Sequence, residues 1–323
     1  MNNHNKKNIV PVGDRENESS GQRMMEYIPA KTIVTKTKAP YWFGADYNMN
    51  IYRGCNHGCI YCDSRSHCYR IDDFGTVRAK QDALRIIRDD LSKKRKRGVI
   101  ATGAMSDPYN PYEEELHLTK NALELIHAYR FGVSIATKST LVVRDTDILK
   151  DIKYRAPVVV KLTITVADDK LCKIIEPNAP VSSERFEATK TLSGSGIYTG
   201  VLMMPILPFI EDTEENIIAI ARKAKECGAR FIYPAMGMTL RAGNREYYYE
   251  NLDRHFPEIK EKYIKRYGER YSCTSPKAKK LWGVFSEECK RLGLLYKMSG
   301  IINDYKREYI DSVEQLGLFE NKQ

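Results

Sequence analysis

The sequence lacks any long hydrophobic run. Its best apolar stretch, Val201–Ile210, has ten residues and is interrupted by Pro205 and Pro208, whereas a membrane-spanning helix needs ~20. The N-terminal segment, Met1–Gly21, also lacks an apolar stretch, so we expect no secretory signal, no membrane partner and a cytoplasmic location. With 42% hydrophobic and 29% charged residues, the composition excludes a disordered chain, a collagen or a coiled coil.

The chain has fewer acidic than basic residues. The chain has 52 Lys and Arg against 42 Asp and Glu, a net charge of +10, which is compatible with a polyanionic partner or simply with a basic, solvated surface. Segment 241–310 has 16 Lys and Arg against 10 Asp and Glu, and it also carries 12 aromatic residues. A second basic run, Lys93–Arg97, ends a predicted helix and is interpreted as a solvated helix end, where cations favour the helix dipole.

Cysteine is present in eight copies. In a chain without a predicted secretory signal, this indicates a reducing compartment, and metal binding or catalysis rather than disulfides. Four cysteines fall within 14 residues, and the other four are scattered and are expected to be buried apolar residues. The clustered cysteines are Cys55, Cys59, Cys62 and Cys68.

Short β-rich runs alternate with amphipathic helical patterns after a polar segment, 1–23, that we expect to be disordered. Six strand–helix steps predict right-handed βαβ units and a parallel sheet. This pattern fits a doubly wound sheet and a partial barrel equally well. After Met238 the alternation stops, and two mostly helical stretches are expected at about 245–271 and 276–293. The expected strands lie within 48–52, 98–102, 132–137, 157–166, 197–206 and 229–234.

The first of these strands leads directly into a cysteine loop with the spacing C-x3-C-x2-C, formed by Cys55, Cys59 and Cys62. Three thiolates on a short loop can hold three irons of a cubane cluster and leave the fourth iron open to a small molecule. Gly54 and Gly58 would let the backbone wrap closely around the cluster. The alternative is a zinc site with Cys68 or His57 as the fourth ligand, although zinc loops usually pair two distant C-x2-C units.

This loop, in a chain of six strand–helix steps, resembles the radical S-adenosylmethionine (SAM) superfamily, and more closely its spore photoproduct lyase-like branch, also called DNA repair photolyase-like. The resemblance covers about residues 27–233. Beyond the cysteines it rests on Ser106–Tyr109, Thr137–Ser139, Glu176–Pro180 with Arg185, and Pro205–Pro208. It implies an α/β fold built as a partial (βα)6 TIM-type barrel over residues 24–240, with a helical, basic and aromatic extension over 241–323.

The resemblance also implies an enzyme with a 4Fe–4S cluster on Cys55, Cys59 and Cys62. With one electron from an external reductant of the flavodoxin or ferredoxin type, such an enzyme cleaves SAM reductively. The resulting 5′-deoxyadenosyl radical abstracts a hydrogen atom from the substrate. The cofactor carries the difficult chemistry, and the protein supplies binding and orientation.

Five residues are candidates for binding SAM, and all are expected near the carboxyl ends of strands, where barrel enzymes build their sites. Ser106 and Asp107 could accept hydrogen bonds from the ammonium group, in place of the superfamily's usual Gly-Gly-Glu. Lys138 could pair with the carboxylate. Thr163 matches a hydroxyl position that contacts SAM in this branch, and Tyr61 is expected to cover the adenine.

The sequence departs from the spore photoproduct lyase-like pattern at one position that bears on the substrate. In spore photoproduct lyase a cysteine two residues before the Ser-Asp pair returns a hydrogen atom to the product radical, and here that position is Ala104. Cys68, Cys273 or Tyr109 could replace it. Lys and Arg of segment 241–310 could neutralise phosphates and its tyrosines could stack on bases, so a nucleic-acid lesion is the leading expectation. The alternatives are a peptide or small-metabolite substrate, and a non-enzymatic, zinc-stabilised nucleic-acid-binding protein.

Overall fold

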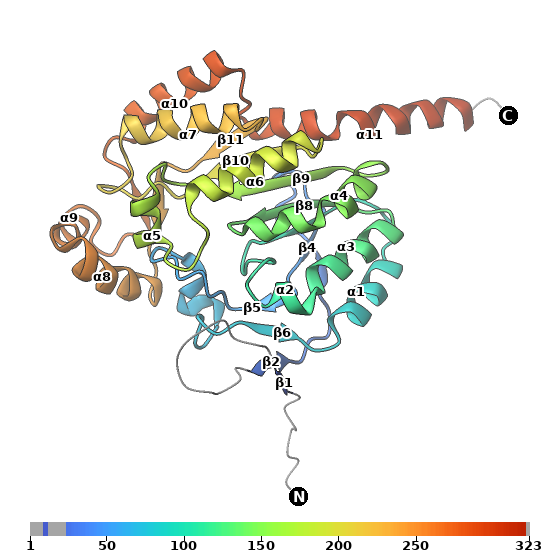
Figure 1. Ribbon diagram of the computed structural model, residues 1–323, viewed down its shortest axis with the longest axis horizontal. Helices are drawn as coiled ribbons and strands as arrows, with labels where there is room; N and C mark the ends of the chain where they lie inside the picture. The colour runs from blue at the N-terminus through green and yellow to red at the C-terminus, as the bar shows by residue number, and fades with distance from the viewer. Residues whose placement is uncertain (1–8, 12–23, 321–323) are drawn as a thin grey trace, which may run out of the picture.

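The computed structural model describes residues 9–11 and 24–320 (Figure 1). At its centre is a seven-stranded sheet in the order β11-β10-β9-β8-β7-β4-β3. The pairs from β4 through β11 are all parallel, and β3 pairs antiparallel with β4 at the edge. The strands are β3 Val34–Lys36, β4 Tyr47–Met49, β7 Val99–Thr102, β8 Gly132–Thr137, β9 Val158–Thr163, β10 Thr199–Met203 and β11 Phe231–Pro234.

Helices follow the parallel strands and cover the outer face of this curved sheet (Figure 1). Six parallel strands connected in this way form the expected partial (βα)6 barrel, which decides against a doubly wound sheet. All six residues of β9 are buried, as expected for a central strand covered on both faces. The helices are α1 Ala83–Ser92, α2 Glu113–Leu116, α3 Leu118–Ala128, α4 Thr146–Lys153, α5 Asp169–Ile175, α6 Ser182–Gly194 and α7 Glu214–Glu226.

Helix α7 begins with a side-chain cap, and the residue before that cap has a separate role. Thr213 is the N-cap, and its hydroxyl oxygen accepts a hydrogen bond from the amide of Asn216 at 3.2 Å. Asp212 instead accepts from the amide of Phe209 at 2.8 Å and from the Ser275 hydroxyl at 2.5 Å. This carboxylate therefore connects the barrel to the segment that follows it.

A small four-stranded sheet, in the order β1-β2-β6-β5, lies beside the barrel. Part of the segment expected to be disordered, Ile9–Pro11, is strand β1 and pairs antiparallel with β2, while residues 1–8 and 12–23 lie outside the described residues. The other strands are β2 Met24–Ile28, β5 Tyr52–Arg53 and β6 Arg78–Lys80. Strand β5 leads into the cysteine loop, which continues through the short 3-10 helices η1 Asp63–Arg65 and η2 His67–Tyr69; a third, η3 Thr140–Asp145, follows β8.

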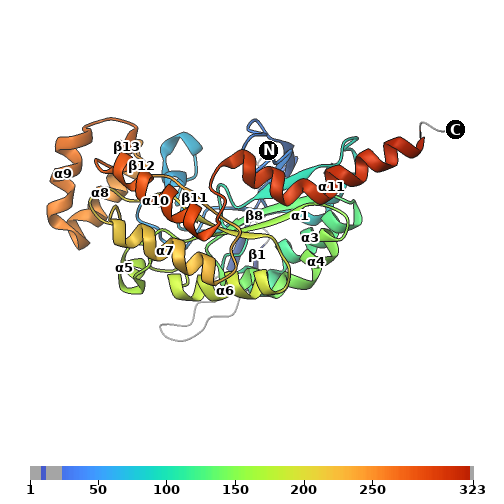
Figure 2. The same cartoon turned by 90° about the horizontal axis from the view of Figure 1, so that it is seen from above.

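The C-terminal part contains helices, as expected, and also a two-stranded antiparallel sheet that the sequence pattern did not predict. Helix α10 packs along α7, while α8 and α9 lie at one end of the molecule and α11 extends toward the other (Figure 2). No helix of the described residues is long and apolar enough to cross a membrane. The elements are β12 Gly237–Thr239, α8 Asn244–His255, α9 Pro257–Tyr267, β13 Ser272–Thr274, α10 Ala278–Leu292 and α11 Met298–Glu320.

Several tyrosines of the C-terminal part are buried, which corrects the expectation that they stack on nucleic-acid bases. Tyr248, Tyr263 and Tyr267 are 0%, 0% and 5% exposed and form the core between α8, α9 and the barrel. The hydroxyl of Tyr263 donates to the carbonyl of Pro208 at 3.1 Å. Stacking on bases is excluded for these buried rings, whereas Tyr271 and Trp282 are 49% and 45% exposed.

Candidate active site

The three cysteines of the C-x3-C-x2-C loop line one cavity of about 120 Å³ at the carboxyl ends of the barrel strands. The cavity is also lined by the segment after β7, Gly103–Asp107, and by Lys138 after β8 and Thr163 at the end of β9. The fold thus brings together residues from four separate segments of the chain. Every metal and SAM candidate except Tyr61 lines this cavity, and Tyr61 lines the larger pocket that adjoins it.

Backbone contacts fix the shape of the cysteine loop. The amide of Cys55 donates to the carbonyl of Phe74 at 2.9 Å, and the amide of Ile60 donates to the carbonyl of Ile175 at 3.0 Å. Gly54 has a φ of +85°, and a Cβ there would approach the carbonyl oxygen of Thr76 to 2.2 Å. Glycine is therefore required at this position, both by its left-handed backbone and by the close approach of a neighbouring chain.

The donor set fits a 4Fe–4S cluster. Burial raises the pKa of the Cys55 thiol to about 11 and also raises the pKa values of Cys59 and Cys62. Three desolvated thiols facing one cavity need a strongly positive group to become thiolates, and iron supplies that charge. Cys68, by contrast, is exposed, and its sulfur accepts a hydrogen bond from Arg241 at 3.2 Å. Among the described residues, no three His, Cys, Asp or Glu side chains converge as they would on a single metal ion.

His57, the other candidate for a fourth zinc ligand, faces Asp107 instead. Its Nε2 lies 3.1 Å from Oδ2 of Asp107. The same carboxylate accepts hydrogen bonds from the Tyr109 amide at 2.9 Å, the Thr137 hydroxyl at 2.6 Å and the Lys138 amide at 2.8 Å. Burial alone would raise the pKa of Asp107, but His57 and these donors lower it to about 2. Asp107 is thus an ionised carboxylate that ties the cysteine loop to the ends of β7 and β8.

Ser106 and Thr163 present hydroxyl groups to the cavity. The Ser106 hydroxyl donates to the carbonyl of Gly54, which leaves its oxygen lone pairs as acceptors. The Thr163 side chain is 8% exposed, and its backbone carbonyl accepts from Arg185 at 2.8 Å. Both hydroxyls stand where a polar ligand in the cavity could reach them. Their binding of SAM stays a prediction.

Lys138 belongs to a buried network at the edge of the same cavity. Its ammonium nitrogen lies 3.8 Å from a carboxylate oxygen of Glu176 and 5.6 Å from the centre of the Tyr61 ring. Glu176, which is 1% exposed, also accepts from the Tyr61 hydroxyl and pairs with Arg185 at 2.5 Å. Burial would raise the pKa of Glu176, but Arg185 and Lys138 hold it below the ordinary value. With two cations on one carboxylate, the network keeps a surplus positive charge beside the cavity.

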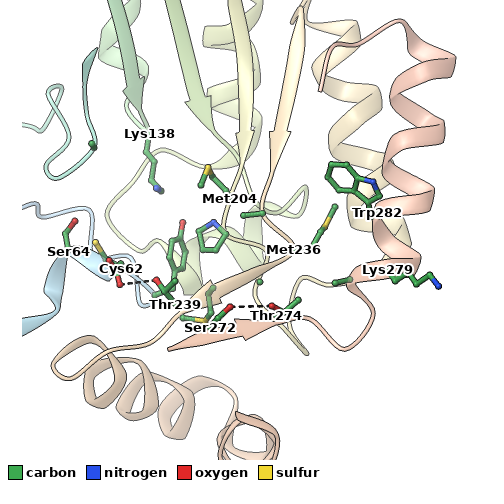
Figure 3. A pocket seen from close by; sticks show the side chains of 18 residues that line it. Cys62, Ser64, Lys138, Met204, Met236, Thr239, Ser272, Thr274, Lys279 and Trp282 are labelled. Atoms are coloured by element: carbon green, nitrogen blue, oxygen red, sulfur yellow. Dashed lines mark hydrogen bonds between the residues drawn. The ribbon is translucent and has the colours of Figure 1, made fainter. Parts of the chain in front are cut away.

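A larger pocket of about 810 Å³ adjoins the cysteine cavity and shares Cys62, Ser64, Ala104 and Lys138 with it. Figure 3 shows its two walls. Hydroxyl groups come from the β12–β13 sheet, and apolar side chains come from the end of β10, the segment after β11, and α10. These side chains are Thr239, Ser272 and Thr274 on the polar wall, and Met204, Met236 and Trp282 on the apolar wall. Lys279 of α10 stands at its edge.

The family model described as the radical SAM superfamily matches residues 49–224 of this chain. The chain belongs to the radical SAM superfamily. Radical SAM enzymes use a 4Fe–4S cluster and SAM, so the chain is an enzyme with these cofactors, and it needs an external reductant. The matched range contains the cysteine loop and all five residues predicted to bind SAM.

The chain is also similar to curated relatives and to solved structures. The chain is 37% identical over 189 residues to uncharacterized protein MJ0683 of Methanocaldococcus jannaschii, covering 58% of this chain and 69% of that protein. It is 28% identical over 232 residues to uncharacterized protein Rv2578c of Mycobacterium tuberculosis, covering 70% and 67%. Spore photoproduct lyase in complex with dinucleoside spore photoproduct has a similar fold, with a TM-score of 0.60 at 14% identity, covering 83% of this chain and 80% of that chain.

The radical SAM methyltransferase TsrM from Kitasatospora setae, bound to tryptophan and a SAM analogue, is also similar in fold. Its TM-score is 0.50 at 12% identity, and the match covers 76% of this chain and 51% of that chain. Both solved structures support a radical SAM barrel. At these sequence identities, the two structures show a similarity of fold only.

The three residues suggested as replacements for the hydrogen-returning cysteine line neither the cysteine cavity nor the larger pocket. Cys68 contacts Arg241, and Cys273 is fully buried on β13 in the α8–α9 core. Tyr109 is 1% exposed and lies along a different pocket together with His57 and Arg144. Ala104, however, lines both the cysteine cavity and the larger pocket. The sequence had no signal for the larger pocket, because β12, β13 and α10 meet the barrel only in three dimensions.

Proposed function

We propose that this radical SAM enzyme acts on a nucleic-acid base or base lesion bound in the 810 Å³ pocket. The observation that carries the proposal is the pocket itself, which opens from the cysteine cavity at Ala104 and Lys138. Its apolar wall of Met204, Met236 and Trp282 suits a planar ring, because nucleic-acid bases stack on aromatic side chains. Its opposite wall offers hydroxyl groups for the edge of that ring.

The cysteine cavity and the larger pocket that adjoins it have different roles in this proposal. Cys55, Cys59 and Cys62 would hold the cluster, and Lys138 with Ser106 would orient SAM. When bound, the cluster and SAM supply a 5′-deoxyadenosyl radical. The chain's part is to place the substrate next to this group and to exclude water from it.

The fold neighbour supports this choice of substrate class. The structure of spore photoproduct lyase contains a dinucleoside lesion, and a dinucleoside carries the planar rings for which the apolar wall provides space. The TsrM structure contains tryptophan instead. A small planar metabolite or a peptide side chain is therefore the alternative substrate that the binding experiment has to distinguish from a nucleic-acid base.

The surface around the pocket tells which cations can contact a nucleic-acid backbone. Lys277 donates from its ammonium to the carbonyl of Asp212 at 3.3 Å, and Lys280 pairs with Glu214. Lys279 lines the pocket, and among the described residues it lies within 4.0 Å of no carboxylate. Of these three neighbouring lysines, Lys279 is therefore the one best placed to meet a phosphate.

Binding of single-stranded oligonucleotides by the anaerobically reconstituted protein tests the proposal. Trp282→Ala should weaken binding by about 5- to 150-fold, the equivalent of one lost stacking contact. Lys279→Ala should weaken binding and reduce its salt dependence. Lys280→Ala, which removes the same charge one residue away, is the matched control and should change affinity much less.

Two results would contradict the proposal. If no DNA or RNA oligonucleotide binds, or if binding does not depend on salt, a peptide or small metabolite becomes the favoured substrate. If Lys280→Ala weakens binding as much as Lys279→Ala, the effect is one of general charge and the pocket is not the binding site.

A further inference from the structure

A separate cavity of about 480 Å³ lies at the opposite end of the barrel. It is formed where the connections α1–β7, α3–β8 and α4–β9 reach the amino ends of their strands and meet helix α11. Figures 1 and 2 both place α1, α3, α4 and α11 away from α8 and α9. The cysteine loop and the predicted SAM residues lie at the carboxyl ends of the strands. This cavity is therefore distinct from the active site.

Four cations surround it. Each of three successive connections contributes one arginine just before a strand begins, and α11 contributes a lysine: Arg97, Arg130, Arg155 and Lys306. The cavity is also lined by Asp46, whose carboxylate accepts a hydrogen bond from the Val99 amide at 2.9 Å. Among the described residues, no carboxylate oxygen lies within 4.0 Å of a charged nitrogen of these four cations.

A neighbouring cavity shows the contrast. It is lined by Arg230 and Arg307, and both guanidinium groups pair with Asp304, at 3.2 and 3.0 Å. The two arginines of that cavity thus share a carboxylate, whereas the four cations of the larger cavity have none within 4.0 Å among the described residues; Arg97 and Lys306 donate there to the backbone carbonyls of Lys94 and Gly44. Like charges placed around one concave site raise its positive potential and attract an anion.

The walls indicate what kind of anion fits. Three guanidinium groups provide planar pairs of donors that match phosphate oxygens. Between them lie apolar surfaces from Val99, Ala156, Pro157 and the ring of Tyr309, and the volume is in the range of small-molecule sites. A concave site with both charged and apolar walls fits a phosphorylated organic molecule better than an extended backbone, which needs an open groove.

We propose that this cavity binds the polyphosphate group of a nucleotide, at a site separate from the SAM site. The arginines contact the phosphates, and the apolar surface contacts the nucleoside. The three arginines come from points 33 and 25 residues apart in the chain. Their convergence is therefore a product of the fold and is not one local basic run.

Isothermal titration of the reconstituted protein with ATP, tripolyphosphate and adenosine tests this assignment. Saturating SAM is present throughout, so that the adenosine-binding part of the active site is filled. The test variant is Arg130→Asn combined with Arg155→Gln. Arg130 has a φ of +58°, and asparagine tolerates that left-handed backbone, so this change removes a charge without adding strain. Arg307→Gln, in the neighbouring cavity, is the control.

We expect ATP and tripolyphosphate to bind, and their dissociation constants to rise about tenfold or more in the double variant, because charge-assisted hydrogen bonds are lost. Adenosine should not bind, Arg307→Gln should bind ATP as the parent does, and formation of 5′-deoxyadenosine should be unchanged in both variants. Three results would overturn the proposal: no binding of either phosphate compound, equal affinity in the parent and the double variant, or displacement of ATP by a single-stranded oligonucleotide with loss of that competition in the double variant. The last result would assign the cavity to nucleic acid.

Discussion

The buried ion network beside the SAM cavity can be tested by replacing Glu176 with glutamine. Glu176 and Arg185 are 1% and 0% exposed, and Lys138 lies 3.8 Å from the same carboxylate. Glu176→Gln keeps the shape of the side chain and an acceptor for the Tyr61 hydroxyl, but it removes the negative charge. Two cations then remain without their shared anion. Arg185 cannot turn toward water, because it also donates to the carbonyls of Pro180 and Thr163 at 2.7 and 2.8 Å.

The expected loss in the free energy of unfolding is about 3–5 kcal/mol, the usual effect of removing one partner of a buried ion pair. Domains are stable by only about 5–15 kcal/mol, so the loss should be evident in urea titrations. Burial would raise the pKa of Glu176, but Arg185 and Lys138 lower it. The carboxylate therefore contributes stability above the unfolded-state pKa, and that contribution is lost as the pH falls through the folded-state value. The difference between parent and variant should shrink in acid.

Glu211 supplies a matched control a short distance away. It is also 1% exposed, but burial raises its pKa to about 8, despite hydrogen bonds from the Thr165 hydroxyl and the Leu207 amide. At pH 6 it is largely protonated in the folded state, so Glu211→Gln should cost less than about 1 kcal/mol or even stabilise the protein. A loss below about 1 kcal/mol for Glu176→Gln, or equal losses for the two variants, would refute the reasoning.

Three further predictions use other residues of the site. Lys138→Met should keep the cluster but raise the dissociation constant of SAM about 10- to 150-fold, from the loss of a charge-assisted hydrogen bond; unchanged affinity in equilibrium binding would remove Lys138 from the SAM site. Glu211→Gln should gain stability relative to the parent by about 1.4 kcal/mol per pH unit between pH 5.5 and 7.5, because the parent must keep a proton that its unfolded chain releases; a constant difference in urea titrations would contradict the raised pKa. The parent should repair spore photoproduct poorly, and Ala104→Cys should increase product formation in a repair assay if the pocket accepts that lesion; efficient repair by the parent would mean that a residue not yet identified returns the hydrogen atom.

The strands and helices of the barrel could be predicted from the sequence because each carries its own hydrophobic period. Strand β8, Gly132–Thr137, has the predicted bounds, and α3 is one of the amphipathic helices expected between the strands. The choice between a barrel and a doubly wound sheet could not be made from periodicity, since both place helices after parallel strands. The resemblance carried by the cysteine loop made that choice correctly.

Contacts between distant residues could not be predicted from the sequence. The tyrosines of α8 and α9 looked like a stacking surface by composition, yet Tyr248 and Tyr263 share a hydrogen bond of 3.0 Å inside a core. The strands β12 and β13 have three residues each, too few for a periodic signal. The ion-pair partner of Lys280 could not be predicted either, because Glu214 lies 66 residues earlier in the chain.

The most direct test of the account is a metal and product analysis of protein reconstituted under anaerobic conditions. The parent should contain about four irons and four sulfides per chain and should form 5′-deoxyadenosine from SAM after reduction. Cys68→Ala should behave as the parent does, while alanine at Cys55, Cys59 or Cys62 should abolish both the cluster and the product. Zinc in place of iron, or a loss of iron in Cys68→Ala as complete as in the other three variants, would contradict the assignment of the cluster to this loop.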